Sequence, residues 1–115
     1  MSDDGVVLAE YLFNVLGIRQ NSVRMLKHMA ACDGVTSDEL EAVVDISQPS
    51  ISIAIKELID HGWVKVDFIR AQGKGRPRHL YSLSKPLCEI VDDIEVEARG
   101  IINRMEEGVA FLREL

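Results

Sequence analysis

The most distinctive chemistry in the sequence belongs to a short basic segment, residues 70–78, which reads RAQGKGRPR. It holds four cations and no acid, so it favours contact with phosphate groups over the alternative of a merely solvated loop. Its glycines let the backbone take positive φ angles and approach a surface closely, and its proline stiffens the exit. We expect nucleic-acid contacts from Arg70, Lys74, Gly75, Arg76, Pro77 and Arg78.

A second candidate segment, residues 47–62, reads SQPSISIAIKELIDHG and predicts a helix. Ser47 can cap the first free N–H groups, Pro49 is tolerated in the opening turn, and Gly62 can end the helix. Apolar residues recur at helical spacing and predict a buried face made of Ile51, Ile55, Leu58 and Ile59. The opposite face is of a type that can lie against base edges in a major groove. Together with the opening residues, it consists of Ser47, Gln48, Pro49, Ser50, Ser52, Ile53 and Lys56.

A shorter helix is predicted immediately before this segment. Thr36 and Glu39 have the spacing of a capping box, and the helix should end near Asp45. Its apolar side is formed by Leu40, Val43 and Val44. Two short helices joined by a tight turn, the second beginning with small polar residues, are the pattern of a helix-turn-helix.

After Gly62, the spacing of the apolar residues changes from that of a helix to that of a strand. Val64, Val66 and Phe68 alternate with polar residues, which predicts a half-buried strand over residues 63–69. A second strand is expected over residues 79–83, and Val35 can add a short strand to the same sheet. The basic segment then becomes the tip of a hairpin, or wing.

The stretch TSDELEAVVDISQPSISIAIKELIDHGWV resembles winged helix-turn-helix transcriptional regulators, in particular the MarR-like and TrmB-like archaeal type. The resemblance extends from Ser22 to about Ser84. It implies a sequence-specific, double-stranded DNA-binding regulator, with repression the more common mode, whose recognition helix lies in the major groove. The Lys74 to Pro77 stretch is similar to the core of the AT-hook, which implies that Arg76 enters a narrow minor groove.

Helices are also expected on both sides of this 19–84 domain. Residues 6–16 of the N-terminal segment 1–18 predict an amphipathic helix ended by Gly17, suited either to core packing or to a dimer interface. The first core helix is expected to begin at a cap on Asn21 or Ser22, with an apolar stripe from Val23 to Ala30, and to end at Asp33 and Gly34. The fold class is therefore mainly α with a small β-hairpin.

The C-terminal segment, residues 85–115, predicts one long helix with a continuous apolar seam. The small core cannot cover such a seam alone, so we expect a homodimer, with packing inside one chain as the alternative. The expected dimer contacts are Leu87, Val91, Ile94, Ala98, Ile101, Met105 and Leu112, with Gly108 in the same seam.

Composition limits the other classes of function. The 115 residues are 47% hydrophobic and 28% charged, which suits one small core. The net charge is −6, yet residues 47–85 carry seven Lys and Arg against three acids, a net of +4 on the expected DNA-facing part. The alternative is a winged-helix module that binds another protein in a transcription assembly through its acidic long helix.

Neither an enzyme nor a metal site is expected. His28 and Cys32 lie four residues apart on a predicted helix, but no further His or Cys pair completes a set of ligands. The sequence also lacks a P-loop and a nucleophile–base arrangement. With two cysteines and no apolar span or export signal, we expect a cytoplasmic protein with no cofactor. We expect Cys32 and Cys88 to be buried, inert thiols, with a redox switch as the alternative. No small-molecule effector is identified by the sequence.

Overall fold

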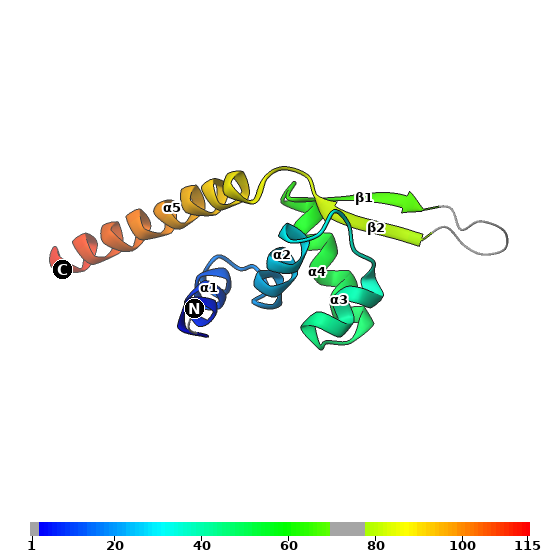
Figure 1. Ribbon diagram of the computed structural model, residues 1–115. Helices are drawn as coiled ribbons and strands as arrows, with labels where there is room; N and C mark the ends of the chain where they lie inside the picture. The colour runs from blue at the N-terminus through cyan, green and yellow to red at the C-terminus, as the bar shows by residue number, and fades with distance from the viewer. Residues whose placement is uncertain (1–2, 70–77) are drawn as a thin grey trace.

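The computed structural model describes residues 3–69 and 78–115 of the chain (Figure 1). Five helices and a two-stranded hairpin make up these residues. In chain order they are α1 (Asp3–Val15), α2 (Asn21–Ala30), α3 (Ser37–Val44), α4 (Gln48–Asp60), β1 (Val64–Ile69), β2 (Arg78–Leu83) and α5 (Leu87–Arg113). The predicted fold class, a winged helix-turn-helix with a flanking N-terminal helix and a long C-terminal helix, is confirmed.

The boundaries of the helix-turn-helix follow from local chemistry. The Thr36 hydroxyl accepts a hydrogen bond from the Glu39 N–H at 3.3 Å, so α3 begins with the predicted cap. Asp45 takes the left-handed conformation (φ 59°) and ends α3, which brings the chain directly into α4. Gly62, also at positive φ (81°), follows the end of α4 as expected for a helix stop.

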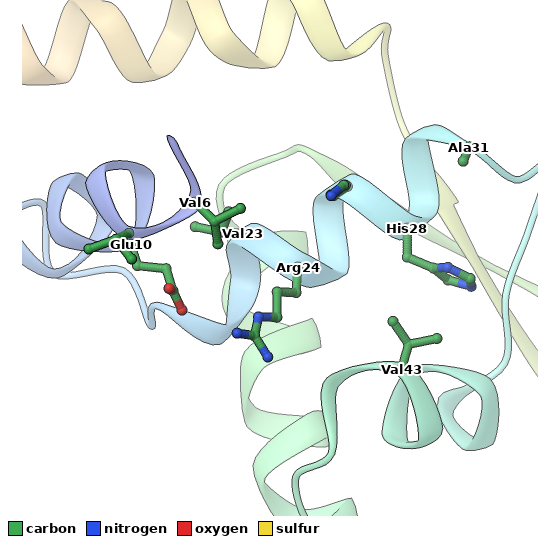
Figure 2. A pocket seen from close by; sticks show the side chains of 9 residues that line it. Val6, Glu10, Val23, Arg24, His28, Ala31 and Val43 are labelled. Carbon is green, nitrogen blue, oxygen red and sulfur yellow. The ribbon is translucent and has the colours of Figure 1, made fainter. Parts of the chain in front are cut away.

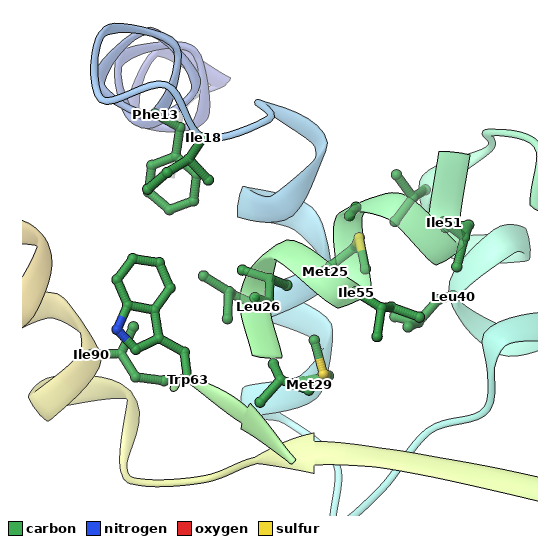
Figure 3. Packing of buried hydrophobic residues seen from close by; sticks show 14 of the residues in the cluster. Phe13, Ile18, Met25, Leu26, Met29, Leu40, Ile51, Ile55, Trp63 and Ile90 are labelled. Atoms are coloured by element: carbon green, nitrogen blue, oxygen red, sulfur yellow. The ribbon is translucent and has the colours of Figure 1, made fainter. Parts of the chain in front are cut away.

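The hydrophobic core lies between α2, α3 and α4 and extends to the start of the hairpin (Figure 3). Met25, Met29, Leu40, Ile51 and Leu58 have almost no exposed surface. These side chains come from three helices, so burying them fixes α4 against the two helices that precede it.

Trp63 connects the core to α5. Its side chain is 1% exposed, and its indole N–H donates a hydrogen bond to Asp93 Oδ2 at 3.1 Å. The Lys85 ammonium also donates to this carboxylate. Ile90, which lies beside the indole (Figure 3), and Ile94 are both buried, so the first two turns of α5 dock on the core while its C-terminal half extends away (Figure 1).

The hairpin is antiparallel, with a register running from Val64 opposite Leu83 to Ile69 opposite Arg78. Val35 forms a single bridge to Tyr81, with N···O distances of 2.9 and 2.8 Å, so the predicted third strand is reduced to one residue. The side chains of β1 are buried only near the base of the hairpin: Val64 is buried, whereas Phe68 is 66% exposed. The prediction of a half-buried strand was therefore wrong for its outer half.

Three further expectations about the helices were wrong. α1 begins at Asp3 and not at residue 6. α2 is preceded by Gln20, which makes no side-chain cap, while Ser22 points into the core and its hydroxyl has no hydrogen-bond partner among the described residues. Ile94, expected in a dimer contact, belongs to the core of the single chain, as does the neighbouring Ile90.

Candidate nucleic-acid interface

Helix α4, the predicted recognition helix, has a buried face and an exposed face. Ile51, Ala54, Ile55 and Leu58 are buried, as the apolar spacing predicts for the three larger side chains. The exposed face carries Pro49, Ser52, Ile53 and Lys56. This face carries one cation, Lys56, and one acid, Asp60, at its C-terminal end, so its N-terminal part suits the hydrogen-bonding and apolar groups of base edges.

Gln48 does not lie free on this face. Its amide nitrogen donates to Glu41 Oε2 at 2.6 Å and to Asp38 Oδ1 at 3.2 Å, and both carboxylates belong to α3. An amide has two N–H donors, so both are occupied. Gln48 therefore ties α4 to α3, a cross-helix contact that sequence spacing did not reveal.

The two serines at the start of α4 also bind each other. Ser47 occupies the predicted cap position with extended backbone, and its carbonyl accepts from the Ile51 N–H at 3.0 Å. Its hydroxyl donates to the Ser50 hydroxyl at 3.1 Å instead of capping a backbone N–H. The expected position of the cap is confirmed, and the expected role of its side chain is wrong.

The structure places the wing beyond the helix-turn-helix, where it projects past α3 (Figure 1). Arg78 is the first residue of β2 and is exposed. The other predicted wing contacts lie outside the described residues; they are Arg70, Lys74, Gly75, Arg76 and Pro77.

Aromatic rings occupy the exposed part of the hairpin, a feature that sequence reasoning missed. The His79 ring meets Phe68 edge to face at a centroid distance of 4.9 Å. Its Nδ1 also lies 3.1 Å from the Tyr81 hydroxyl. Partial burial raises the pKa of Tyr81. The cross-strand alternation of rings was the signal that would have revealed this cluster.

A cleft of about 630 Å³ lies between α1, α2 and α3 (Figure 2). Its apolar lining comes mainly from valines, while Arg24, Lys27 and His28 lie on one side of α2 and Glu10 faces them from α1. Two cations beside apolar walls suit a small organic anion. In the sequence, the i, i+3, i+4 spacing of Arg24, Lys27 and His28 could have indicated that they share one side of a helix.

A smaller groove, of about 270 Å³, runs between α1 and α5. It is formed by Tyr11, Leu12, Val15, Leu16, Ala98, Ile101, Ile102 and Met105. The predicted seam residues thus have different environments: Ile94 is buried, Ala98 and Ile101 are half-buried in the groove, and Leu87, Val91, Met105 and Leu112 are exposed. No side chain of the described residues approaches the position of a Cβ on Gly108.

The described residues contain no cluster of three His, Cys, Asp or Glu side chains that could hold a metal ion. Cys32 Sγ lies 3.9 Å from His28 Nε2. Both Cys32 and Cys88 are exposed, so the expectation of buried thiols was wrong. Among residues 3–69 and 78–115, no helix is both long enough and apolar enough to cross a membrane.

Solved structures share this arrangement of elements. A possible transcriptional regulator from Methanosarcina mazei Go1 superposes with a TM-score of 0.66, covering 96% of this chain and 88% of that one at 12% identity. A MarR-family transcriptional regulator from Silicibacter pomeroyi gives a TM-score of 0.58, with 95% and 75% covered at 23% identity. NadR in complex with 4-hydroxyphenylacetate also gives 0.58, with 92% and 74% covered at 17% identity.

Comparison by sequence adds nothing to this likeness: no protein-family model matches, and no curated protein does either. The structural likeness shows a winged-helix fold of the MarR type. The TrmB-like and archaeal parts of the resemblance stay predictions.

Proposed function

We propose that this chain is a sequence-specific double-stranded DNA-binding transcriptional regulator that acts as a homodimer in the cytoplasm. The observation that carries the proposal is the exposed face of α4, uncharged at Pro49, Ser52 and Ile53, which α2 and α3 hold beside a projecting hairpin in a MarR-type fold. Helix-turn-helix proteins place such a face in the major groove. Repression by blocking access to the bound DNA is the mode we favour.

The two parts of the interface have different roles in this proposal. Ser52, Ile53 and Lys56 contact the major groove, and Pro49 lies against it at the start of the helix. Ser47, Gln48 and Ser50 mainly hold that start in place, as their mutual and cross-helix hydrogen bonds support. The wing cations bind phosphates or a neighbouring minor groove.

Dimerisation is supported by the shape of the single chain. Its Cα radius of gyration is 17.3 Å, whereas a compact chain of this length would have about 13 Å. Both α5 and the β1–β2 hairpin extend from the core (Figure 1), and the C-terminal half of α5 carries exposed Met105, Val109 and Leu112. A second copy is the partner that would cover this apolar surface, together with the exposed side of α1.

Control by a small molecule is a further part of the proposal. The NadR structure contains 4-hydroxyphenylacetate, an aromatic carboxylate. In this chain, the cleft that Arg24 and Lys27 line suits a ligand of the same chemical class. A ligand there would touch both α1 and the helix-turn-helix, so its binding would bias their relative position.

The direct test is selection of bound genomic fragments, followed by titration of the selected duplex and a scrambled duplex at several salt concentrations. We expect tighter binding to the selected duplex, and weaker binding to both as salt rises. Equal affinity for the two duplexes at every salt concentration would contradict sequence-specific recognition.

The second candidate function is protein–protein interaction through the acidic α5. Residues 86–115 carry eight acids against three Lys and Arg. Salt-insensitive capture of one protein partner, lost on truncation of α5 and accompanied by no duplex binding, would favour this function over DNA recognition.

A further inference from the structure

We infer that Ile53 recognises a thymine by packing against its 5-methyl group in the major groove. The inference rests on the proposed DNA-binding function and specifies a base group for one side chain. Thymine alone presents a methyl group on the major-groove edge, so an apolar protein side chain can distinguish it from the other bases.

The exposure of Ile53 separates it from every other aliphatic residue of α4. Ile51, Ala54, Ile55 and Leu58 are all less than 5% exposed and belong to the core, and Ile59 is partly buried against it, whereas Ile53 is 50% exposed. Ile53 therefore contributes little to the stability of the single chain. It lies one turn after Pro49 and one turn before Lys56, in the middle of the exposed face.

The hydrogen bonds of Gln48 strengthen this assignment. A glutamine reads adenine by donating from its amide nitrogen while accepting at its oxygen. In this chain, the Gln48 nitrogen already donates to Glu41 and Asp38, so such a contact would break two hydrogen bonds to carboxylates. Among the remaining exposed side chains of α4, Pro49 has no hydrogen-bonding group, Ser52 is short, Lys56 only donates, and Asp60 lies in the last turn.

Isoleucine is also well suited to a fixed apolar contact. A β-branched side chain in a helix has one strongly preferred χ1 rotamer, so Ile53 presents its methyl groups at a defined position. Little side-chain entropy is then lost when it meets the base. Lys56, which lies three residues further along, would fix the register through a phosphate or a guanine edge.

The test is a cycle that pairs two proteins with two kinds of DNA. The parent protein and Ile53→Ala are titrated against the selected duplex, and against duplexes in which each thymine in turn is replaced by deoxyuridine, which lacks only the 5-methyl group. At one thymine per half-site, we expect the parent to lose about fourfold in affinity for the methyl removed. Ile53→Ala should bind the thymine and deoxyuridine duplexes equally.

Val96→Ala is the matched control, because it also truncates an exposed aliphatic side chain, but on α5 outside the proposed DNA contacts, and leaves Ile53 in place. It should keep the fourfold sensitivity to deoxyuridine. If the parent binds all deoxyuridine duplexes as tightly as thymine duplexes, or if Ile53→Ala keeps the sensitivity, Ile53 does not read a methyl group although DNA recognition stands. If the parent selects no duplex at all, the proposed function fails, and the inference fails with it.

Discussion

Asp93 is the residue whose ionisation is most closely linked to the structure. Hydrogen bonds from Lys85 and then from the Trp63 indole hold the pKa of this carboxyl below its ordinary value, against a small opposing effect of burial. A lowered folded-state pKa means that the charged form is preferred in the folded protein. The associated stability is present above the ordinary carboxyl range, about 3.9, and is lost as the pH falls through the folded-state pKa.

Trp63 gives a direct measurement of this ionisation, since it is the only tryptophan in the chain. We expect its fluorescence to change with pH in a transition below the ordinary carboxyl range, because protonation weakens the hydrogen bond from the indole. Asp93→Asn should lack this transition, whereas Asp92→Asn, one residue away and exposed, should keep it. An unchanged transition in Asp93→Asn would assign the titration to another group.

At the scale of elements, the basic wing should contribute mainly electrostatic affinity for DNA. Replacing both Arg76 and Arg78 with alanine removes up to two cations that bind phosphates in each chain. For each phosphate that is no longer neutralised, the slope of log affinity against log salt should fall by about 0.9. Arg99→Ala is the control, because Arg99 lies on α5 and pairs there with Glu95 at 3.7 Å. An unchanged slope in the double variant would place the wing away from the DNA.

Arg76 should also have an effect that Arg78 lacks. If its similarity to the AT-hook extends to its binding mode, Arg76→Ala should bind A·T-rich and G·C-rich flanks more equally. Arg78→Ala should instead weaken binding to both flanks alike. Titrations of the two single variants against both flanking compositions measure this difference.

The junction of the hairpin with α2 allows a separate test of stability. A Cβ on Gly34 would lie 2.8 Å from the Leu80 side chain, at both Cγ and Cδ2. We therefore expect Gly34→Ala to lower the free energy of unfolding by about 1–3 kcal/mol. The cost of the substitution should be smaller in a Leu80→Ala background, because the obstructing atoms are gone.

Gly100 is the matched control for Gly34 in urea unfolding. It lies inside α5 with open space where a Cβ would be, so Gly100→Ala should raise the free energy of unfolding by about 1 kcal/mol. Equal effects of the two alanine substitutions would show that the contact with Leu80 has no energetic weight.

The elements also show why some features were predictable from the sequence. The ends of α3 and α4 depend on Thr36, Glu39 and Gly62, whose effects act over three or four neighbours, and these boundaries were confirmed. The buried position of Ile90 depends on how α5 docks beside Trp63, which no local period specifies. The pairing of Gln48 with Glu41 likewise needs two helices in place before it exists.

At the scale of the whole molecule, the dimer prediction should now be tested away from Ile94. That residue belongs to the core, so a charge there would unfold the chain whatever the oligomeric state. Met105 and Leu112 are more than 60% exposed in the single chain. Replacing both with glutamate should leave the core intact and convert dimers to monomers.

Val96→Glu is the control for this substitution, because Val96 is 73% exposed and faces away from the Met105 side of α5. It should remain dimeric. Sedimentation equilibrium gives the mass, and circular dichroism checks that the helices persist. A Met105→Glu, Leu112→Glu protein that stays dimeric would show that copies associate through another surface.

Because α5 attaches to the core mainly through its first turns, a small change in its angle there moves its far end by a large distance. Its 27 residues span about 40 Å; Ile90, Ile94 and the Asp93 carboxylate fasten its first turns to the core, and Ala98 and Ile101 are half-buried beside α1. A rotation of about 5° at that fastening moves the far end by about 3.5 Å, roughly the rise of one DNA base pair. In the proposed dimer, the angle between α5 and the core at Trp63 therefore sets the spacing between the two half-sites, although Trp63 lies far from any base.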